Sequence, residues 1–146
     1  MEMEVLKVKR LRPGALLPRR ATEGSSGLDL FACIDGADHM LLHRQPARVG
    51  TGIAIEFPHG FDVQVRPRSG LAARGVGVML GTIDSDYRGE VLVTMFLFGD
   101  LQEYRLGNGD RIAQLVITRL GDLRVVEVQE LTDTARGVGG HGSTGQ

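Results

Sequence analysis

Alternation of apolar and polar residues runs through the middle of the chain and predicts β-strands. IAIEF (53–57) and FDVQV (61–65) alternate in this way, which is typical of strands that bury one face. The tetrad FPHG (57–60) between them supplies a turn. RIAQLVI (111–117) and VVEVQEL (125–131) are predicted to follow as two further strands.

One stretch, VLVTMFLF (91–98), is almost continuously apolar and predicts a strand that is buried on both faces. No stretch keeps a 3.6-residue period, so the one helix expected is short, near LAAR (71–74), with Ser69 as its N-cap. The 21 glycines separate the apolar runs as turn residues do. The pattern therefore predicts an all-β sandwich or barrel.

The character of the chain changes at Thr132. The last fifteen residues, TDTARGVGGHGSTGQ, contain five glycines and almost no apolar side chains. Two interpretations stay open: an end without fixed structure, or a lid that becomes ordered on a ligand. The chain is thus expected to consist of one β domain (1–131) and a flexible glycine-rich tail (132–146).

Composition excludes several classes of protein. With 42% apolar residues, 24% charged residues and a net charge of −1, the 146-residue chain lacks the basic surface that a nucleic acid polymer or an anionic membrane attracts. No apolar run approaches the roughly 20 residues of a membrane span, and MEMEVLKVKR is too charged for a signal peptide. The single cysteine, Cys33, lies in the apolar run LDLFACI, where burial and a reducing cytoplasm are expected.

Two familiar sequence motifs lack the structural context that their usual functions require. GHGSTG (140–145) matches G-x-G-x-x-G, but a dinucleotide fingerprint needs a strand before it and a helix after it. His39 and His43 have the spacing of a helical zinc site in a stretch without helical pattern. In an extended chain their side chains stand about 13 Å apart, too far to share one metal.

The stretch GTIDSDYRGE (81–90) raises the possibility of chemistry, although Asp, Ser and Gly also suit an ordinary hairpin turn. PRSGLA (67–72) places an arginine and a serine before the short helix, a favourable site for an anion. Three other polar stretches accompany these two: SSGLDL (25–30) with Asp29, GDRIAQL (109–115) with Gln114, and RGVGGHGSTG (136–145) with Arg136.

In this order the five stretches resemble the homotrimeric deoxyuridine triphosphatase (dUTPase) family, from about residue 21 to the C-terminus. The resemblance implies a β jelly roll that hydrolyses dUTP to dUMP and pyrophosphate with Mg²⁺. Such an enzyme limits uracil incorporation into DNA and supplies dUMP for thymidylate synthesis. It also implies a homotrimer with active sites between subunits, closed by the tail.

The resemblance assigns roles to individual positions. Asp84 matches the residue that activates the attacking water, and Tyr87 the aromatic that excludes a 2′-hydroxyl. Arg68, Ser69 and Gln114 match phosphate contacts, and Arg136 the γ-phosphate clamp. Asp29 is implied to support the metal through water. The other implied substrate contacts are Gly70, Gly81, Thr82, Ile83, His141, Gly142, Ser143 and Thr144.

The residues depart from the family pattern at two places. The link ARGVGVML (73–80) is shorter than usual and lacks an asparagine, which affects the uracil contacts before Gly81. His141 stands where the tail usually has phenylalanine. Asp86 is expected to cap the turn or pair with an arginine, and Arg88 to pair locally or across a subunit interface.

Two other functions remain as alternatives. A dCTP deaminase, alone or bifunctional, shares the fold and the Arg-Ser pair, but lacks the Asp-Tyr-Arg-Gly run and this tail. A catalytically inactive, nucleotide-sensing trimer is disfavoured because Asp84, Tyr87, Arg68 and Arg136 are all present.

Overall fold

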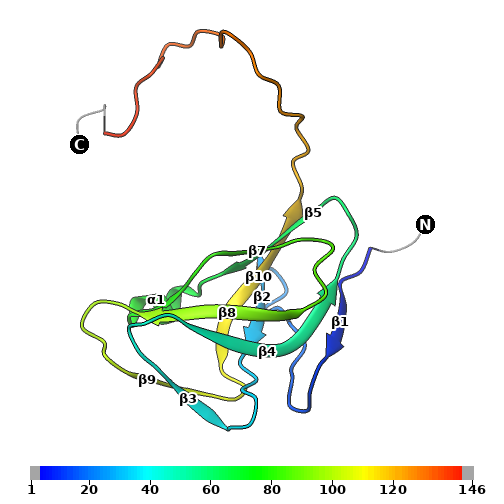
Figure 1. Cartoon of the computed structure of the whole chain (residues 1–146), viewed down its shortest axis with the longest axis vertical. Helices are drawn as coiled ribbons and strands as arrows, with labels where there is room; N and C mark the ends of the chain where they lie inside the picture. The colour runs from blue at the N-terminus through cyan, green and yellow to red at the C-terminus, as the bar shows by residue number, and fades with distance from the viewer. Residues whose placement is uncertain (1–3, 143–146) are drawn as a thin grey trace.

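The computed structural model describes residues 4–142 and contains two antiparallel four-stranded sheets, a two-stranded sheet and one short helix (Figure 1). The elements are β1 (Lys7–Arg10), β2 (Gly27–Phe31), β3 (His39–Leu42), β4 (Ala47–Glu56), β5 (Phe61–Arg66), α1 (Ser69–Ala73), β6 (Val76–Val78), β7 (Gly81–Ile83), β8 (Glu90–Leu97), β9 (Tyr104–Gly107) and β10 (Arg111–Arg119).

The strands are ordered β1-β4-β8-β6 in the first sheet and β2-β10-β5-β7 in the second, with β3 and β9 as a separate pair. Neighbours in each sheet are mostly distant in sequence, as in a jelly roll. The predicted all-β fold with one short helix is confirmed.

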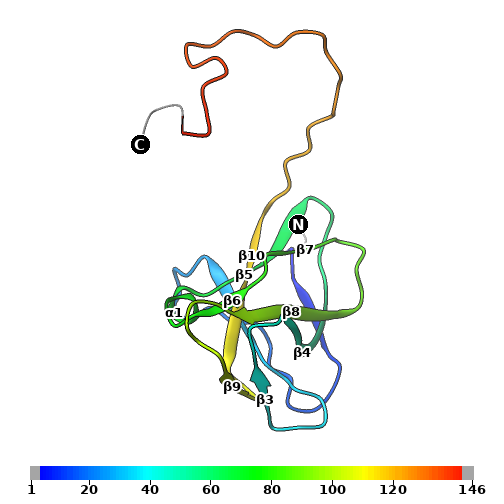
Figure 2. The same ribbon diagram turned by 60° about the vertical axis from the view of Figure 1, so that its left-hand side comes forward.

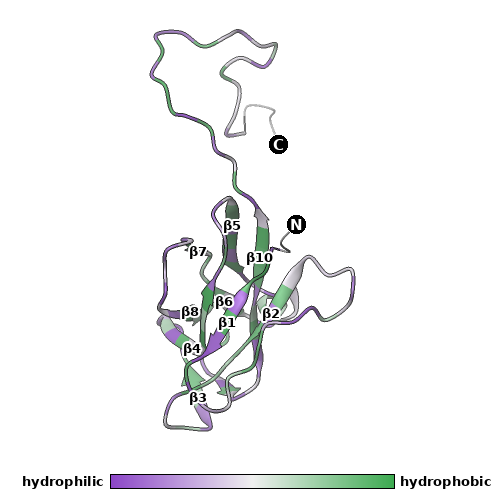
Figure 3. Ribbon diagram, turned by 90° about the vertical axis from the view of Figure 1, so that its right-hand side faces the viewer, coloured by the Kyte–Doolittle hydropathy of each residue, from purple (hydrophilic) through white to green (hydrophobic). Residues whose placement is uncertain are grey.

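The core fills the space between the two sheets. Val49, Val93 and Met95 from the first sheet and Val63 and Leu115 from the second are fully buried. Figure 3 shows the apolar residues concentrated in strands such as β5 and β10. The expected burial of Cys33 is confirmed, and its thiol is free.

The details of β8 and α1 correct two predictions. Burial alternates along β8 and Leu92 is 43% exposed, so the strand buries one face rather than two. Its outer face carries Leu92 and Phe96 on either side of Thr94, which made the sequence look almost continuously hydrophobic. Ser69 is the first helical residue rather than the N-cap; Arg68 takes that position and makes no side-chain capping bond.

The predicted strand at 125–131 is wrong. From Gly121 to Gly142 the chain has no strand and extends away from the body after β10 (Figures 1 and 2). An extended segment becomes a strand only by pairing with another, and this one has no neighbour within residues 4–142. Within residues 4–142 the single helix, α1, is too short to cross a membrane.

Candidate active site

Three strands of the second sheet bring one group of polar residues together. Gln114 of β10 lies opposite Asp29 of β2 on one side and opposite Arg66 of β5 on the other. Arg68 follows β5, and its Nε lies 3.6 Å from Asp29 Oδ1. Gln114 Nε2 donates to the Pro67 carbonyl at 3.0 Å. This bond holds the segment that follows β5 against β10. Asp29, Arg68, Ser69 and Gln114 are called the Arg68 group below.

Asp29 is the buried charge of this group, with 8% of its surface exposed. A second guanidinium, that of Arg111, lies 3.8 Å from its other oxygen. The carboxylate is therefore compensated by two cations and orients Arg68. Ser69 and Gly70 are exposed at the start of α1, next to this cluster.

A second group surrounds the turn between β7 and β8. The Tyr87 amide donates to the Asp84 carbonyl at 3.1 Å, and Tyr87 Oη donates to the Glu90 carbonyl at 2.7 Å. Asp84 and Tyr87 are both exposed. They belong to a pocket of about 220 Å³, called the Asp84 pocket, whose lining residues are Val65, Gly81, Thr82, Ile83, Asp84, Tyr87, Glu90, Val91 and Leu92.

The structure keeps the two groups apart within one chain. Val65 pairs with Gly81 and Val63 with Ile83, so the antiparallel register places Asp84 level with Asp62. Arg68 lies six residues further along, about 20 Å away at roughly 3.3 Å per residue. Figures 1 and 2 both show α1 on one side of the body and the β7–β8 turn on the other.

The tail lies away from both groups. Arg136, His141 and Gly142 are exposed, and the bond from Arg136 Nε goes to the nearby Gly139 carbonyl. The expected contacts at Ser143 and Thr144 lie outside the described residues.

The short link before Gly81 is an exposed apolar connection. Only Met79 and Leu80 separate β6 from β7, and they expose 54% and 72% of their surface. Because β6 pairs with β8 and β7 with β5, this link crosses from one sheet to the other. The effect of this shorter link on the uracil contacts stays a prediction.

Residues of the turn itself pair locally. Arg88 Nη1 donates to the Ser85 carbonyl at 2.8 Å, and Arg88 Nε lies 3.4 Å from Glu56. Within one chain this is the local pairing of the two alternatives for Arg88. Within residues 4–142 the Asp86 side chain makes neither the expected cap nor an ion pair.

Three residues near these groups had no role in the sequence interpretation: Val65, Glu90 and Arg111. Val65 and Glu90 line the Asp84 pocket, and Arg111 contacts Asp29. Glu90 and Arg111 stand inside the quoted motifs, which was a usable signal. Val65 looks like any core valine, and only the strand pairing with Gly81 reveals it.

Known proteins are similar to this chain over almost its whole length. The family model described as dUTPase matches residues 14–145. Deoxyuridine 5'-triphosphate nucleotidohydrolase of Hydrogenobaculum sp. is 50% identical over 144 residues, covering 96% of this chain and 97% of the relative. The enzyme of the same name from Anaplasma marginale is 46% identical, covering 97% and 99%.

Solved structures show the same similarity. The Staphylococcus bacteriophage 80alpha dUTPase with dUPNHPP has a TM-score of 0.84 and 26% identity, covering 97% of this chain and 99% of that one. Because a family model and relatives of nearly equal length match almost the whole chain, this protein belongs to the dUTPase family.

Proposed function

We propose that this protein hydrolyses dUTP to dUMP and pyrophosphate. The observation that carries the proposal is the Asp84 pocket, in which an exposed carboxylate and a tyrosine stand beside a strand edge. Relatives named deoxyuridine 5'-triphosphate nucleotidohydrolase, 50% and 46% identical to this chain, support the same activity. The name of these relatives favours hydrolysis over deamination or sensing alone.

In the proposed reaction a water molecule attacks the α-phosphorus in line with the departing pyrophosphate. Asp84 orients this water and accepts its proton, while Arg68, Ser69 and Gln114 hold the phosphate oxygens. Such a transfer depends on alignment and neutralisation of charge, which a carboxylate–water pair and two arginines, Arg68 and Arg136, provide.

The uracil and sugar are proposed to lie in the Asp84 pocket. The main chain from Gly81 to Ile83 presents the donors and acceptors that match the uracil edge. Tyr87 packs under the deoxyribose and leaves no space for a 2′-hydroxyl.

Mg²⁺ is the proposed cofactor, held mainly by the substrate phosphates. A related dUTPase mutant from phage phi11 of S. aureus, 23% identical with a TM-score of 0.75, contains a structural Mg(II) ion. Within residues 4–142 no cluster of three or more His, Cys, Asp or Glu side chains forms a metal cage. Asp29, which is paired with two arginines, would support through water an ion that is bound mainly by phosphates. The ion supplies charge neutralisation on the triphosphate.

A homotrimer with shared active sites is the proposed assembly. The separation of about 20 Å between Arg68 and Asp84 exceeds the combined reach of both side chains, which supports a site that neighbouring subunits share. The extended segment after β10 supports this, because Leu123, Val125 and Leu131 expose 89%, 95% and 87% of their surface. Apolar residues left in water in this way favour contact with another subunit.

Light scattering at micromolar concentration is expected to give a mass of three chains for the active species. The physical reason is that no single chain places the Arg68 group and the Asp84 pocket together. A fully active monomer would contradict this prediction.

The tail, residues 132–146, is proposed to close over the bound nucleotide. Arg136 then reaches the γ-phosphate, and His141 and Gly142 cover the base, with Ser143 and Thr144 adding phosphate contacts. The free buried thiol of Cys33 suits the cytoplasm, the proposed location.

Tyr87→Ala is expected to relax the choice of sugar. Exclusion of a 2′-hydroxyl depends on the ring filling its place, so the ratio of kcat/KM for dUTP over UTP should fall. Steady-state kinetics with both nucleotides measures this ratio. An unchanged ratio would place the sugar filter elsewhere.

The proposed activity is tested by pyrophosphate release from dUTP, dTTP, dCTP and UTP with Mg²⁺. Release from dUTP alone is expected. Ammonia release from dCTP would favour the deaminase, and nucleotide binding without either product would favour the sensing trimer.

A further inference from the structure

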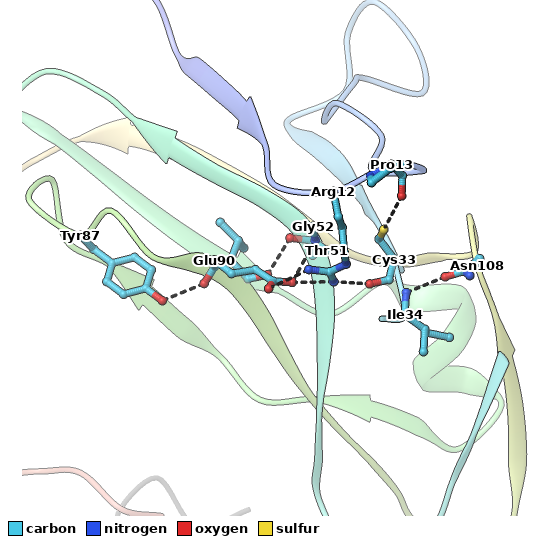
Figure 4. Close-up of polar contacts among 10 residues, drawn as sticks. Arg12, Pro13, Cys33, Ile34, Thr51, Gly52, Tyr87, Glu90 and Asn108 are labelled. Carbon is cyan, nitrogen blue, oxygen red and sulfur yellow. Dashed lines mark hydrogen bonds and ion pairs between the residues drawn. The ribbon is translucent and has the colours of Figure 1, made fainter. Parts of the chain in front are cut away.

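Arg12, which lies outside the five matched stretches, forms an ion pair with Glu90, a residue that lines the Asp84 pocket (Figure 4). Arg12 donates to both oxygens of Glu90, through Nη1 at 3.0 Å and Nη2 at 2.9 Å, and Nη2 also donates to the Cys33 carbonyl. The two side chains expose only 20% and 23% of their surface. Arg12 does not line the Asp84 pocket, whereas Glu90 does.

The pair lies where the backbone ladder of the first sheet is interrupted. The register between β4 and β8 shifts between Gly50 and Ala54, which is a bulge in β4. Side chains replace the missing ladder bonds at this point. The Gly52 amide donates to Glu90 Oε2 at 3.0 Å, and Thr51 Oγ1 donates to the Val91 carbonyl at 2.6 Å. The start of β8 is therefore held by the Glu90 side chain.

Close packing fixes this arrangement. A Cβ atom on Gly50 would lie 2.5 Å from Glu90 Oε2 and 2.6 Å from an Arg12 nitrogen, so the pair occupies the space that a side chain there would need. The hydrogen bonds from Arg12 lower the pKa of Glu90, and the Gly52 amide adds to this effect. The carboxylate thus stays charged and bonded throughout the neutral range.

Stability alone gives a weak reason for such a pair. Desolvation offsets much of the attraction between two charges that are largely removed from water. Arg12 Nε is also buried without a hydrogen-bond partner in the described part of the chain. The pair is better explained by the positions that it imposes on neighbouring residues.

The geometry is transmitted to Tyr87 by one hydrogen bond. Tyr87 Oη donates to the carbonyl of Glu90, the residue whose side chain Arg12 holds. The ring also lies against Gly89, where an added Cβ would be 2.5 Å from Oη. Figure 4 shows this chain of contacts from Arg12 through Glu90 to Tyr87.

We propose that Arg12 is a positioning residue for sugar selection: by holding Glu90 at the β4 bulge, it sets where the Tyr87 ring stands in the nucleoside pocket. The inference rests on the proposed dUTP hydrolysis. Arg12 itself touches no substrate.

The main test compares kcat/KM for dUTP and UTP in Arg12→Met. The dUTP-over-UTP ratio is expected to fall about fivefold, the scale of one ordinary hydrogen bond. Both constants are measured on the same folded molecules, so a lower folded fraction cancels from the ratio. Lys7→Met is the matched control, because it removes the exposed Lys7–Glu56 ion pair at 3.1 Å and should leave the ratio unchanged.

Arg12→Lys carries the test if Arg12→Met does not fold. Lysine keeps the charge but cannot bind both carboxylate oxygens in the same plane. The ratio should fall by a smaller factor than in Arg12→Met, about twofold. A wild-type ratio in every Arg12 variant that folds would overturn the proposal.

A double-variant cycle tests whether Arg12 acts through Tyr87. Tyr87→Phe keeps the ring and removes only the bond to Glu90, so Arg12→Met should lower the ratio little further in that background. If the two substitutions instead lower the dUTP-over-UTP ratio by independent factors that multiply, Arg12 acts by another route.

A readout independent of activity separates this proposal from the proposed function. With 3-fluorotyrosine incorporated, the two tyrosines of the chain, Tyr87 and Tyr104, give two ¹⁹F resonances. Arg12→Met should move or broaden that of Tyr87 and leave that of Tyr104 in place. If the wild type releases no pyrophosphate from dUTP, the proposed function is refuted. If the Tyr87 resonance neither moves nor broadens in Arg12→Met, the positioning role is refuted.

Discussion

Asp84→Asn is expected to bind dUTP normally and to lose turnover. The amide is nearly isosteric with the carboxylate but cannot accept the proton of the attacking water. Asp84 is exposed at the end of β7 and lines the pocket beside Tyr87, so the substitution disturbs no packing. Removal of a general base is expected to lower kcat by at least about 10²-fold.

Asp86→Asn is the matched control for this experiment. Asp86 lies in the same turn, is exposed like Asp84, and does not line the pocket. Its variant should keep kcat close to the wild-type value. Binding of a non-hydrolysable dUTP analogue, measured by calorimetry, checks that Asp84→Asn still forms the complex. If Asp84→Asn hydrolyses dUTP within a few-fold of the wild-type rate, the role of Asp84 as base is refuted.

Truncation after Thr134 is expected to abolish efficient hydrolysis and to leave a folded trimer. The removed residues include Arg136, and an arginine that stabilises phosphoryl transfer is worth on the order of 10³-fold or more. In the described part of the removed segment, no side chain is buried against the body. The midpoint of thermal unfolding should therefore remain near that of the full chain, while kcat/KM falls steeply.

Two controls separate the lid from a structural contribution. The shortened chain keeps the exposed apolar segment that contains Leu123 and Leu131, so light scattering should still give three chains. Arg136→Met in the full-length chain isolates the guanidinium and should account for a large part of the lost activity. A fall in thermal stability as severe as the fall in activity would contradict the lid.

Local pattern was sufficient for the strands whose burial alternates within one chain. β5 follows from alternation, since period two is imposed by the strand itself, whereas β10 and the turn at 57–60 follow from their residue types. The family resemblance was carried by short stretches whose order in the sequence needs no structure. Short strands such as β6 and β7, with three residues each, have too few positions to show a period.

Predictions that depended on partners failed. The strand expected at 125–131 requires a neighbouring strand, and the residues described here provide none. For β8, the sequence shows that both faces are apolar but not that only one meets the core. Ser69 could serve as a cap by type, but Arg68 is the last extended residue and the helix already begins at Ser69.

By itself, the sequence determined the all-β class, the turns and the residue types available for chemistry, because these follow from local spacing and side-chain properties. Only the tertiary structure decided which residues share a site. The register of β5 with β7 sets Asp84 about 20 Å from Arg68, and the bulge in β4 joins Arg12 to Glu90 across 78 positions. Register and bulges arise from pairing between strands that are distant in sequence, so no local pattern encodes them.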